Sequence, residues 1–212
     1  MTALRRQQLI RLSGDGWARV LDGSWDTTAR SCLGLWAARG LPLVVTRQPS
    51  MGEGRVATGL PAPARYRRRR LALAIEPRDV MFFDEFPRAD AATRLLPRGV
   101  AVPWRALLAT LDAADCAPRV YGGFGWQALT RMAYVHAQSD LDLLLPVGCA
   151  AHADAVAQAL AAAAWDGPRL DGELLFPDGG AIAWREWHAH RQGRAARVLV
   201  KRLHGVALEC PA

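Results

Sequence analysis

The fold is decided by residues 119–145, which read RVYGGFGWQALTRMAYVHAQSDLDLLL. The first three residues, 119–121, predict a buried strand that ends at Gly122 and Gly123. Apolar residues at helical spacing then predict a helix, and a second strand follows over residues 139–145. This stretch therefore predicts a strand, a glycine turn, a helix and another strand that carries two aspartates.

Asp140 and Asp142 are two residues apart in the second predicted strand. Their side chains point to one face of the strand, while Leu141 and Leu143 point to the core. Adjacent carboxylates repel each other, and Mg²⁺ prefers oxygen ligands from one or two carboxylates together with substrate phosphates. We therefore expect a Mg²⁺ site at Asp140 and Asp142, although solvated aspartates at a strand end would give the same pattern.

The glycine turn lies directly upstream of this pair. Backbone N–H groups at the start of a helix bind phosphate, because they have no partners inside the helix and lie at the positive end of its dipole. Gly122 and Gly123 are thus predicted to bind a triphosphate, with Trp126 close enough to border a base or a ribose.

Short strands, among them residues 41–46 and 71–75, dominate the first half of the chain, and a turn is predicted at 48–52. A segment rich in Pro, Arg and Asp separates this half from the stretch above. We place a domain boundary near residue 98. The prediction is an α+β protein with a small β-rich domain over residues 1–98 and a mixed-sheet catalytic domain over 99–212.

In the second domain, apolar spacing predicts helices over residues 104–114 and 152–165. A hairpin is expected from strands at 169–176 and 181–187, joined by a turn that contains two glycines. The run 198–208 closes the domain.

Composition bounds the function further. The net charge is +7, and 26 of the 27 basic residues are arginines, which favours a phosphorylated or acidic partner. The run of four arginines at residues 67–70 has no interleaved aromatic side chains that could stack on bases, so we do not expect nucleic acid. No stretch has the length of a signal peptide or a membrane span, and the four cysteines form no metal motif, so we expect a cytoplasmic protein.

The residue order in four segments makes these predictions more specific. YGGFGWQALT at 121–130, SDLDLL at 139–144, DGEL at 171–174 and AIAWRE at 181–186 resemble the phosphoribosyl-dephospho-CoA transferases of malonate decarboxylase, also called holo-acyl-carrier-protein synthases. This family is part of the nucleotidyltransferase superfamily. The resemblance covers nearly the whole chain and is densest between residues 118 and 205.

The resemblance implies a specific reaction. The 2′-(5″-phosphoribosyl)-3′-dephospho-CoA group passes from triphosphoribosyl-dephospho-CoA to a serine of the acyl-carrier subunit, and pyrophosphate is released. It places Asp140 and Asp142 at Mg²⁺, and Gly122, Gly123 and Ser139 at the substrate. A third metal carboxylate is usual in the superfamily, and its candidates here are three acidic residues, Asp171, Glu173 and Glu186.

One position departs from the family pattern, and it keeps alternatives open. Gly123 stands where the family usually has serine, so one hydroxyl contact to phosphate is missing. A nucleotidyltransferase that acts on another small molecule or on nucleic acid would share the metal site. A binding module that has kept the fold and lost the chemistry is the third alternative.

Overall fold

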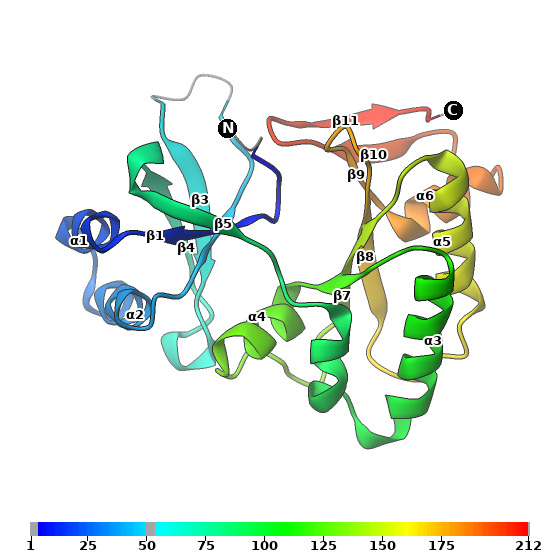
Figure 1. Ribbon diagram of the computed structural model, residues 1–212, viewed down its shortest axis with the longest axis horizontal. Coiled ribbons are helices and arrows are strands. Elements are labelled where there is room, and N and C mark those ends of the chain that lie inside the picture. The colour runs from blue at the N-terminus through cyan, green and yellow to red at the C-terminus, as the bar shows by residue number, and fades with distance from the viewer. Residues whose placement is uncertain (1–3, 50–53, 212) are drawn as a thin grey trace. The chain divides into compact units, whose positions relative to one another are not determined.

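The computed structural model describes residues 4–49 and 54–211, which form two compact units (Figure 1). The first unit extends to Phe86 and also includes Met132–Tyr134 and Leu203–Gly205. The remaining described residues make up the second unit. Each unit has its own sheet, and helices accompany both, so the α+β class is confirmed.

The first unit contains an antiparallel sheet with the strand order β4-β3-β2-β1-β5. Its strands are β1 (Leu9–Leu12), β2 (Leu43–Val45), β3 (Val56–Pro61), β4 (Arg70–Ile75) and β5 (Val80–Asp84). The predicted strands at 41–46 and 71–75 are confirmed as β2 and β4. Residues 50–52 of the predicted turn lie outside the described residues.

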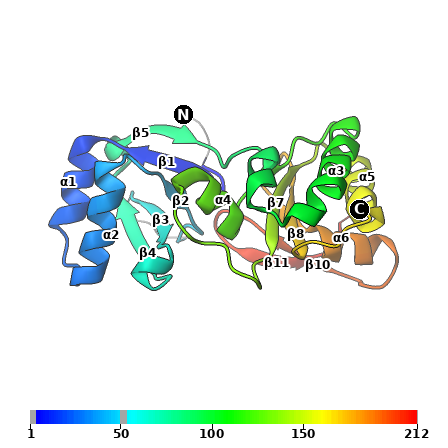
Figure 2. The same cartoon turned by 90° about the horizontal axis from the view of Figure 1, so that it is seen from below.

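Two helices in the first unit were not predicted from the sequence. They are α1 (Gly14–Asp22) and α2 (Thr27–Ala38), which lie side by side (Figures 1 and 2). Each begins at a capping side chain, since Ser13 accepts from the N–H of Gly16 and Asp26 from that of Ala29. Short 3₁₀ helices occupy Ala64–Tyr66 and Pro77–Asp79.

Residues 65–70 form what we call the arginine loop, with five arginines in six positions. Arg67 and Arg68 both have positive φ angles, of 61° and 53°, which are uncommon for residues other than glycine. The loop and the residues before it bind the segment 132–134 within the first unit. Arg68 Nη1 donates to the Tyr134 carbonyl at 3.1 Å, and the N–H of Ala64 donates to the Ala133 carbonyl at 3.0 Å.

The second unit contains a six-stranded sheet with the order β11-β10-β9-β8-β7-β6. Its strands are β6 (Arg119–Val120), β7 (Leu141–Pro146), β8 (Leu170–Leu175), β9 (Ala181–Ala183), β10 (Val198–Lys201) and β11 (Val206–Glu209). β7 and β8 are parallel, and the other pairs in this sheet are antiparallel. The parallel register sets Asp142 beside Asp171 and Leu144 beside Glu173.

Helices cover one face of this second sheet. Figure 1 shows α3, α5 and α6 gathered on that face, where they share a core with Leu141, Leu143 and Leu145. The helices are α3 (Ala101–Ala113), α4 (Gly122–Thr130), α5 (Ala150–Ala162) and α6 (Trp184–Arg191), with 3₁₀ segments at Ala89–Leu95 and Arg98–Val100. The helices predicted at 104–114 and 152–165 are α3 and α5. None of the helices in the described residues is long and apolar enough to cross a membrane.

Some predicted elements differ in the structure. The strand expected at 181–187 ends at Ala183, and α6 begins at Trp184, because Trp184 and Trp187 are buried at helical spacing. Residues 87–98 lie before the predicted boundary, yet Ala89, Ala92 and Leu96 pack in the core of the second unit. The units divide after Phe86.

Candidate active site

β7 presents Asp142 on the face of the second sheet opposite the helix-covered core. Leu141, Leu143 and Leu145 are fully buried in the core, and Asp142 alternates with them along the strand. Asp140 lies directly before β7, which begins at Leu141. In the described residues, neither aspartate side chain makes a hydrogen bond or an ion pair, so both carboxylates are available to a ligand.

Gly122 lies against the Asp142 carboxyl group. Its φ of +58° is readily adopted only by glycine, and a Cβ at this position would overlap the Asp142 carboxylate, with the carboxyl carbon 2.8 Å away. The N–H of Tyr121 donates to the Asp142 carbonyl at 3.0 Å. The structure therefore joins the glycine turn and the aspartate that the sequence separates by 20 positions.

α4 begins at Gly122 itself, so both glycines belong to its first turn. Tyr121 is the N-cap residue, and no side chain caps this end. The first N–H groups of a helix have no partners within it, and without a capping side chain they remain free for an anion. The uncapped end and the Asp142 carboxyl thus adjoin, which suits a phosphate held together with a cation.

The Asp142 carboxyl is electrostatically strained. Its pKa is raised to about 7, first by burial and then by repulsion from Asp171, Asp140 and Glu173, against a smaller lowering by Arg169. The repulsion from Asp171 and Glu173 arises from the sheet register, which brings a second acidic strand alongside β7. A bound cation would relieve this repulsion.

The three candidates for a third carboxylate have different surroundings. Asp171 stands beside Asp142 and pairs with Arg169 at 3.3 Å. Glu173 is 4% exposed and accepts from Lys201 Nζ at 2.7 Å. Glu186 lies on α6 and accepts from the N–H of Leu199 at 2.9 Å. Of these three candidates, Asp171 and Glu173 raise the pKa of Asp142, and Glu186 does not contribute.

The donor set agrees with a substrate-assisted metal site better than with a complete protein cage. Among residues 4–49 and 54–211, no three His, Cys, Asp or Glu side chains gather closely enough to enclose an ion. Asp140 and Asp142 supply oxygen atoms, and one Glu173 oxygen is buried without a hydrogen-bond partner. Mg²⁺ is commonly held by one or two carboxylates plus substrate phosphates, so these residues fit it.

The remaining predicted substrate residues lie around the start of α4. Ser139 Oγ is 3.9 Å from the position that a Cβ on Gly123 would take, and it accepts from the N–H of His136 at 3.0 Å. Gly123 does not have a positive φ, in contrast to Gly122. Trp126 is part of α4 and is 4% exposed. Ser139 thus brings a hydroxyl next to the position where the family pattern has one.

Sequence reasoning missed Arg169 as part of this site. It stands two residues before Asp171 on the same face, and this spacing could have identified it. No local sequence pattern could place Lys201 beside this site, since its contact with Glu173 crosses from β10 to β8.

Two family models match the chain along its length. The model described as the phosphoribosyl-dephospho-CoA transferase MdcG N-terminal domain matches residues 5–86, and that of the C-terminal domain matches residues 86–211. The chain belongs to the phosphoribosyl-dephospho-CoA transferase family. The resemblance seen in the sequence is confirmed, and the protein is a transferase of this family.

Individual relatives agree with the family models. A phosphoribosyl-dephospho-CoA transferase of Xanthomonas euvesicatoria pv. vesicatoria is 40% identical over 201 residues, which cover 92% of this chain and 89% of the relative. One of Bradyrhizobium diazoefficiens is 35% identical over 208 residues, with 96% and 88% coverage. No solved structure matches this transferase significantly.

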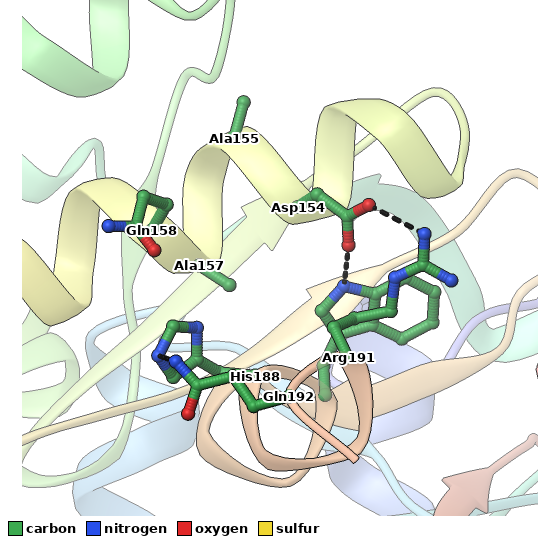
Figure 3. Close-up of a pocket in the computed structure, with 8 residues that line it drawn as sticks. Asp154, Ala155, Ala157, Gln158, His188, Arg191 and Gln192 are labelled. Carbon is green, nitrogen blue, oxygen red and sulfur yellow. Dashed lines mark hydrogen bonds and ion pairs between the residues drawn. The ribbon is translucent and has the colours of Figure 1, made fainter.

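A pocket of about 400 Å³ lies between α5 and α6 of the transferase, on the helix-covered side of the second sheet (Figure 3). Asp154 accepts from Trp187 Nε1 at 2.8 Å and from Arg191 at 2.9 Å, while His188 and Gln192 bond to each other. These five side chains therefore bond to one another within the pocket. The acidic residues around Asp142 lie on the other face of the sheet.

The histidines and cysteines give no further site. His188 and His190 are two residues apart in α6, and the ring nitrogens of His190 bond to the carbonyls of Ala195 and Pro211. All four cysteines are free thiols, as expected, and burial raises the pKa of Cys32 to about 11 and that of Cys116 to about 12.

Proposed function

We propose that this transferase moves the 2′-(5″-phosphoribosyl)-3′-dephospho-CoA group from its triphosphate precursor to a serine of the acyl-carrier subunit of malonate decarboxylase. The serine oxygen forms a bond to the phosphorus nearest the ribose. The bond from this phosphorus to the leaving pyrophosphate breaks, and the serine proton is released to solvent. Membership of the family supports the transferred group, and the acceptor follows from the resemblance to the malonate decarboxylase proteins.

The observation that carries the proposal is the contact between Gly122 and Asp142. An uncapped helix end favours phosphate, while a buried carboxyl group with acidic neighbours favours a cation. A triphosphate bound with its counter-cation satisfies both requirements at once. Neither group alone would select such a ligand.

Each residue has a role in this proposal. Asp140 and Asp142 hold Mg²⁺ together with the donor's phosphates. Among the three candidates for a further carboxylate we favour Asp171, because it adjoins Asp142 and is more accessible than Glu173, and it adds negative charge near the ion rather than a third protein ligand. When bound, the ion supplies charge stabilisation at the phosphoryl group that is transferred. The first N–H groups of α4 and the Ser139 hydroxyl bind and orient the triphosphate.

The basic charge supports an acidic protein acceptor. Residues 1–86 contain 14 arginines against eight acidic residues, whereas residues 87–212 contain 13 basic and 12 acidic residues. Arg67 and Arg70 in the arginine loop are exposed. Such a surface speeds the encounter with an acidic carrier without taking part in the chemistry. We expect a cytoplasmic protein, as the decarboxylase partner implies.

The test is transfer itself. Triphosphoribosyl-dephospho-CoA, the purified carrier subunit and the transferase are incubated with Mg²⁺, and the carrier is followed by intact mass. The expected result is a mass gain on the carrier that requires the acceptor serine and is lost with Asp142→Asn. Pyrophosphate release without a labelled carrier would contradict the proposed acceptor and favour another nucleotidyl acceptor, whereas no turnover at all would favour a binding module.

A further inference from the structure

Lys201 is the sole lysine in a chain with 26 arginines, and it lies on the same sheet face as the acidic residues. In β10, Val198 and Val200 are buried in the core under the helices. Lys201 alternates with them and donates from Nζ to Glu173 Oε1 at 2.7 Å. Its ammonium group is therefore on the face that carries Asp142 and Asp171.

The pair of Lys201 and Glu173 is chemically incomplete. Glu173 is 4% exposed, yet its Oε2 atom has no hydrogen-bond partner among the described residues. The ammonium group has three N–H donors, and Glu173 is its one acceptor in the described part of the chain. The Lys201 side chain is 28% exposed, so the pair is buried at Glu173 and open at the ammonium group. Such a pair stabilises the fold poorly, because the desolvation of Glu173 is compensated only when its second oxygen atom also has a partner.

The position of the pair relates it to the candidate site. Glu173 follows Asp171 by two residues, so the two lie on the same face of β8 about 7 Å apart along the strand. Asp171 in turn lies beside Asp142. The spacing between Asp171 and Glu173 would allow a chain of phosphates to bind at the carboxylates with one end and at the Lys201 ammonium group with the other.

We propose that Lys201 is a substrate-binding residue whose ammonium group binds the pyrophosphate part of the donor's triphosphate, and that Glu173 positions it. This inference rests on the proposed function. As the bond to the transferred phosphorus breaks, negative charge develops on the leaving pyrophosphate, and a cation already held in place stabilises that charge. An ammonium group is a compact point charge, in contrast to the planar guanidinium of the many arginines.

A purely structural role makes a different prediction. Suppose that Lys201 serves only to neutralise buried Glu173. Removal of both charges should then restore the melting temperature, the pyrophosphate affinity and the donor KM that removal of one charge changes. The double variant Lys201→Met with Glu173→Gln therefore separates the two roles. Arg191→Met is the matched control, because it removes a cation from an ion pair with Asp154 in the same unit.

The first experiment measures pyrophosphate affinity by calorimetry with Mg²⁺, donor KM and melting temperature for each variant. We expect the double variant to melt close to the wild type but to bind pyrophosphate at least about tenfold more weakly, with a matching rise in donor KM. Arg191→Met should leave both values unchanged. Wild-type pyrophosphate affinity and donor KM in the double variant would overturn the proposal.

A second experiment needs no variant, so it stands even if the double variant fails to fold. Lys201 is the only side-chain amine, and its acetylation by an amine-reactive ester is measured by peptide mass, with the α-amino group of the same chain as the internal reference. Pyrophosphate with Mg²⁺ is expected to slow the modification of Lys201 at least about tenfold relative to the reference. Equal modification rates with and without pyrophosphate would overturn the proposal.

The two proposals fail in different ways. If pyrophosphate protects Lys201 but the carrier gains no mass, the anion site stands and the proposed acceptor is wrong. If the carrier gains mass while Lys201 is unprotected, the proposed function stands and the role of Lys201 is overturned.

Discussion

The two units of this transferase use charge in opposite ways. The first unit carries most of the net positive charge, and much of it lies in the exposed arginine loop. The second unit is nearly balanced in charge but concentrates Asp140, Asp142, Asp171 and Glu173 around one pair of strands, where burial raises the pKa of Asp142 to about 7. Exposed charge is screened and acts on association, whereas partly buried charge acts on chemistry and stability. Substitutions in the two units should therefore affect different measurements.

The largest effect is expected in the acidic strands. Asp142→Asn should lower the rate of transfer at least about 100-fold. Metal-ion effects are commonly worth several kcal/mol, and a 100-fold change in rate corresponds to about 2.7 kcal/mol of activation free energy. Melting temperature should stay constant or rise, since a repelled carboxylate is removed. Carrier labelling and thermal melting measure both effects, with exposed Asp166→Asn as the control. Activity within about tenfold of the wild type would remove Asp142 from the site.

A pair of neighbouring glycines tests the contact between the helix and Asp142. Gly122→Ala should destabilise the protein by about 2 kcal/mol or more and abolish transfer, because its Cβ meets the carboxylate and its φ is +58°. Gly123→Ala should be mild, since only Ser139 Oγ lies within 4 Å of the added atom. Thermal unfolding compares the two variants, and we expect the melting temperature to fall by about 5 °C for Gly122→Ala. Equal melting temperatures for the two variants would contradict the contact.

The arginine loop supplies the opposite case. Neutralising Arg67 and Arg70 together to Gln should slow association with the carrier about tenfold at low salt, while kcat at saturating carrier stays unchanged. Raising salt to physiological strength should slow the wild type and narrow its difference from the variant. Stopped-flow association rates provide the measurement. A rate independent of both salt and the substitution would mean that the arginines do not dock the carrier.

Stability against pH isolates the Asp142 carboxyl group in metal-free protein. Its pKa of about 7 in the folded state lies above the ordinary value of 3.8, so the folded state holds this proton more tightly than the unfolded state does. The stabilising contribution is complete below about pH 4 and is lost as pH rises to about 7 and above. Melting curves with a chelator should show the decline in the wild type, and Asp142→Asn should lack that part of it.

The smallest effect is expected at Gly123. Replacement by serine adds a hydroxyl that can donate to phosphate, and the absence of a positive φ removes the main source of strain. Ser139 Oγ already lies 3.9 Å from the new Cβ, so we expect a fall in donor KM of about threefold, below the tenfold that a new bond to a charged group can give. An unchanged KM in a stably folded variant would mean that this end of α4 does not hold the donor.

Local patterns in the sequence were sufficient to predict much of the second unit. Alternation around Asp142 and helical spacing at Trp104 identified β7 and α3 because each pattern reports one buried face. The helices α1 and α2 escaped because glycines interrupt both, although Ser13 and Asp26 gave capping signals that could have found them.

The arrangement of the site depended on contacts that no local pattern contains. The order of the three acidic candidates needed the parallel register of β7 and β8 and the partner of each carboxylate. The closeness of Gly122 to Asp142 likewise arises from tertiary packing. For Ala181–Trp187, the aromatic residues suited a strand as well as a helix, and burial of Trp184 and Trp187 in the core decided for the helix.

The discontinuity of the first unit has a consequence for synthesis of the chain. Met132–Tyr134 and Leu203–Gly205 belong to this unit, and the N–H of Gln48 donates to the Leu203 carbonyl at 2.7 Å. Translation proceeds from the N-terminus at about 5–20 residues per second, so Leu203–Gly205 leaves the ribosome only after nearly all of the second unit has been made. The first unit therefore begins folding first but is completed last. A ribosome-bound chain truncated after residue 86 would lack Met132–Tyr134 and Leu203–Gly205, which belong to this unit.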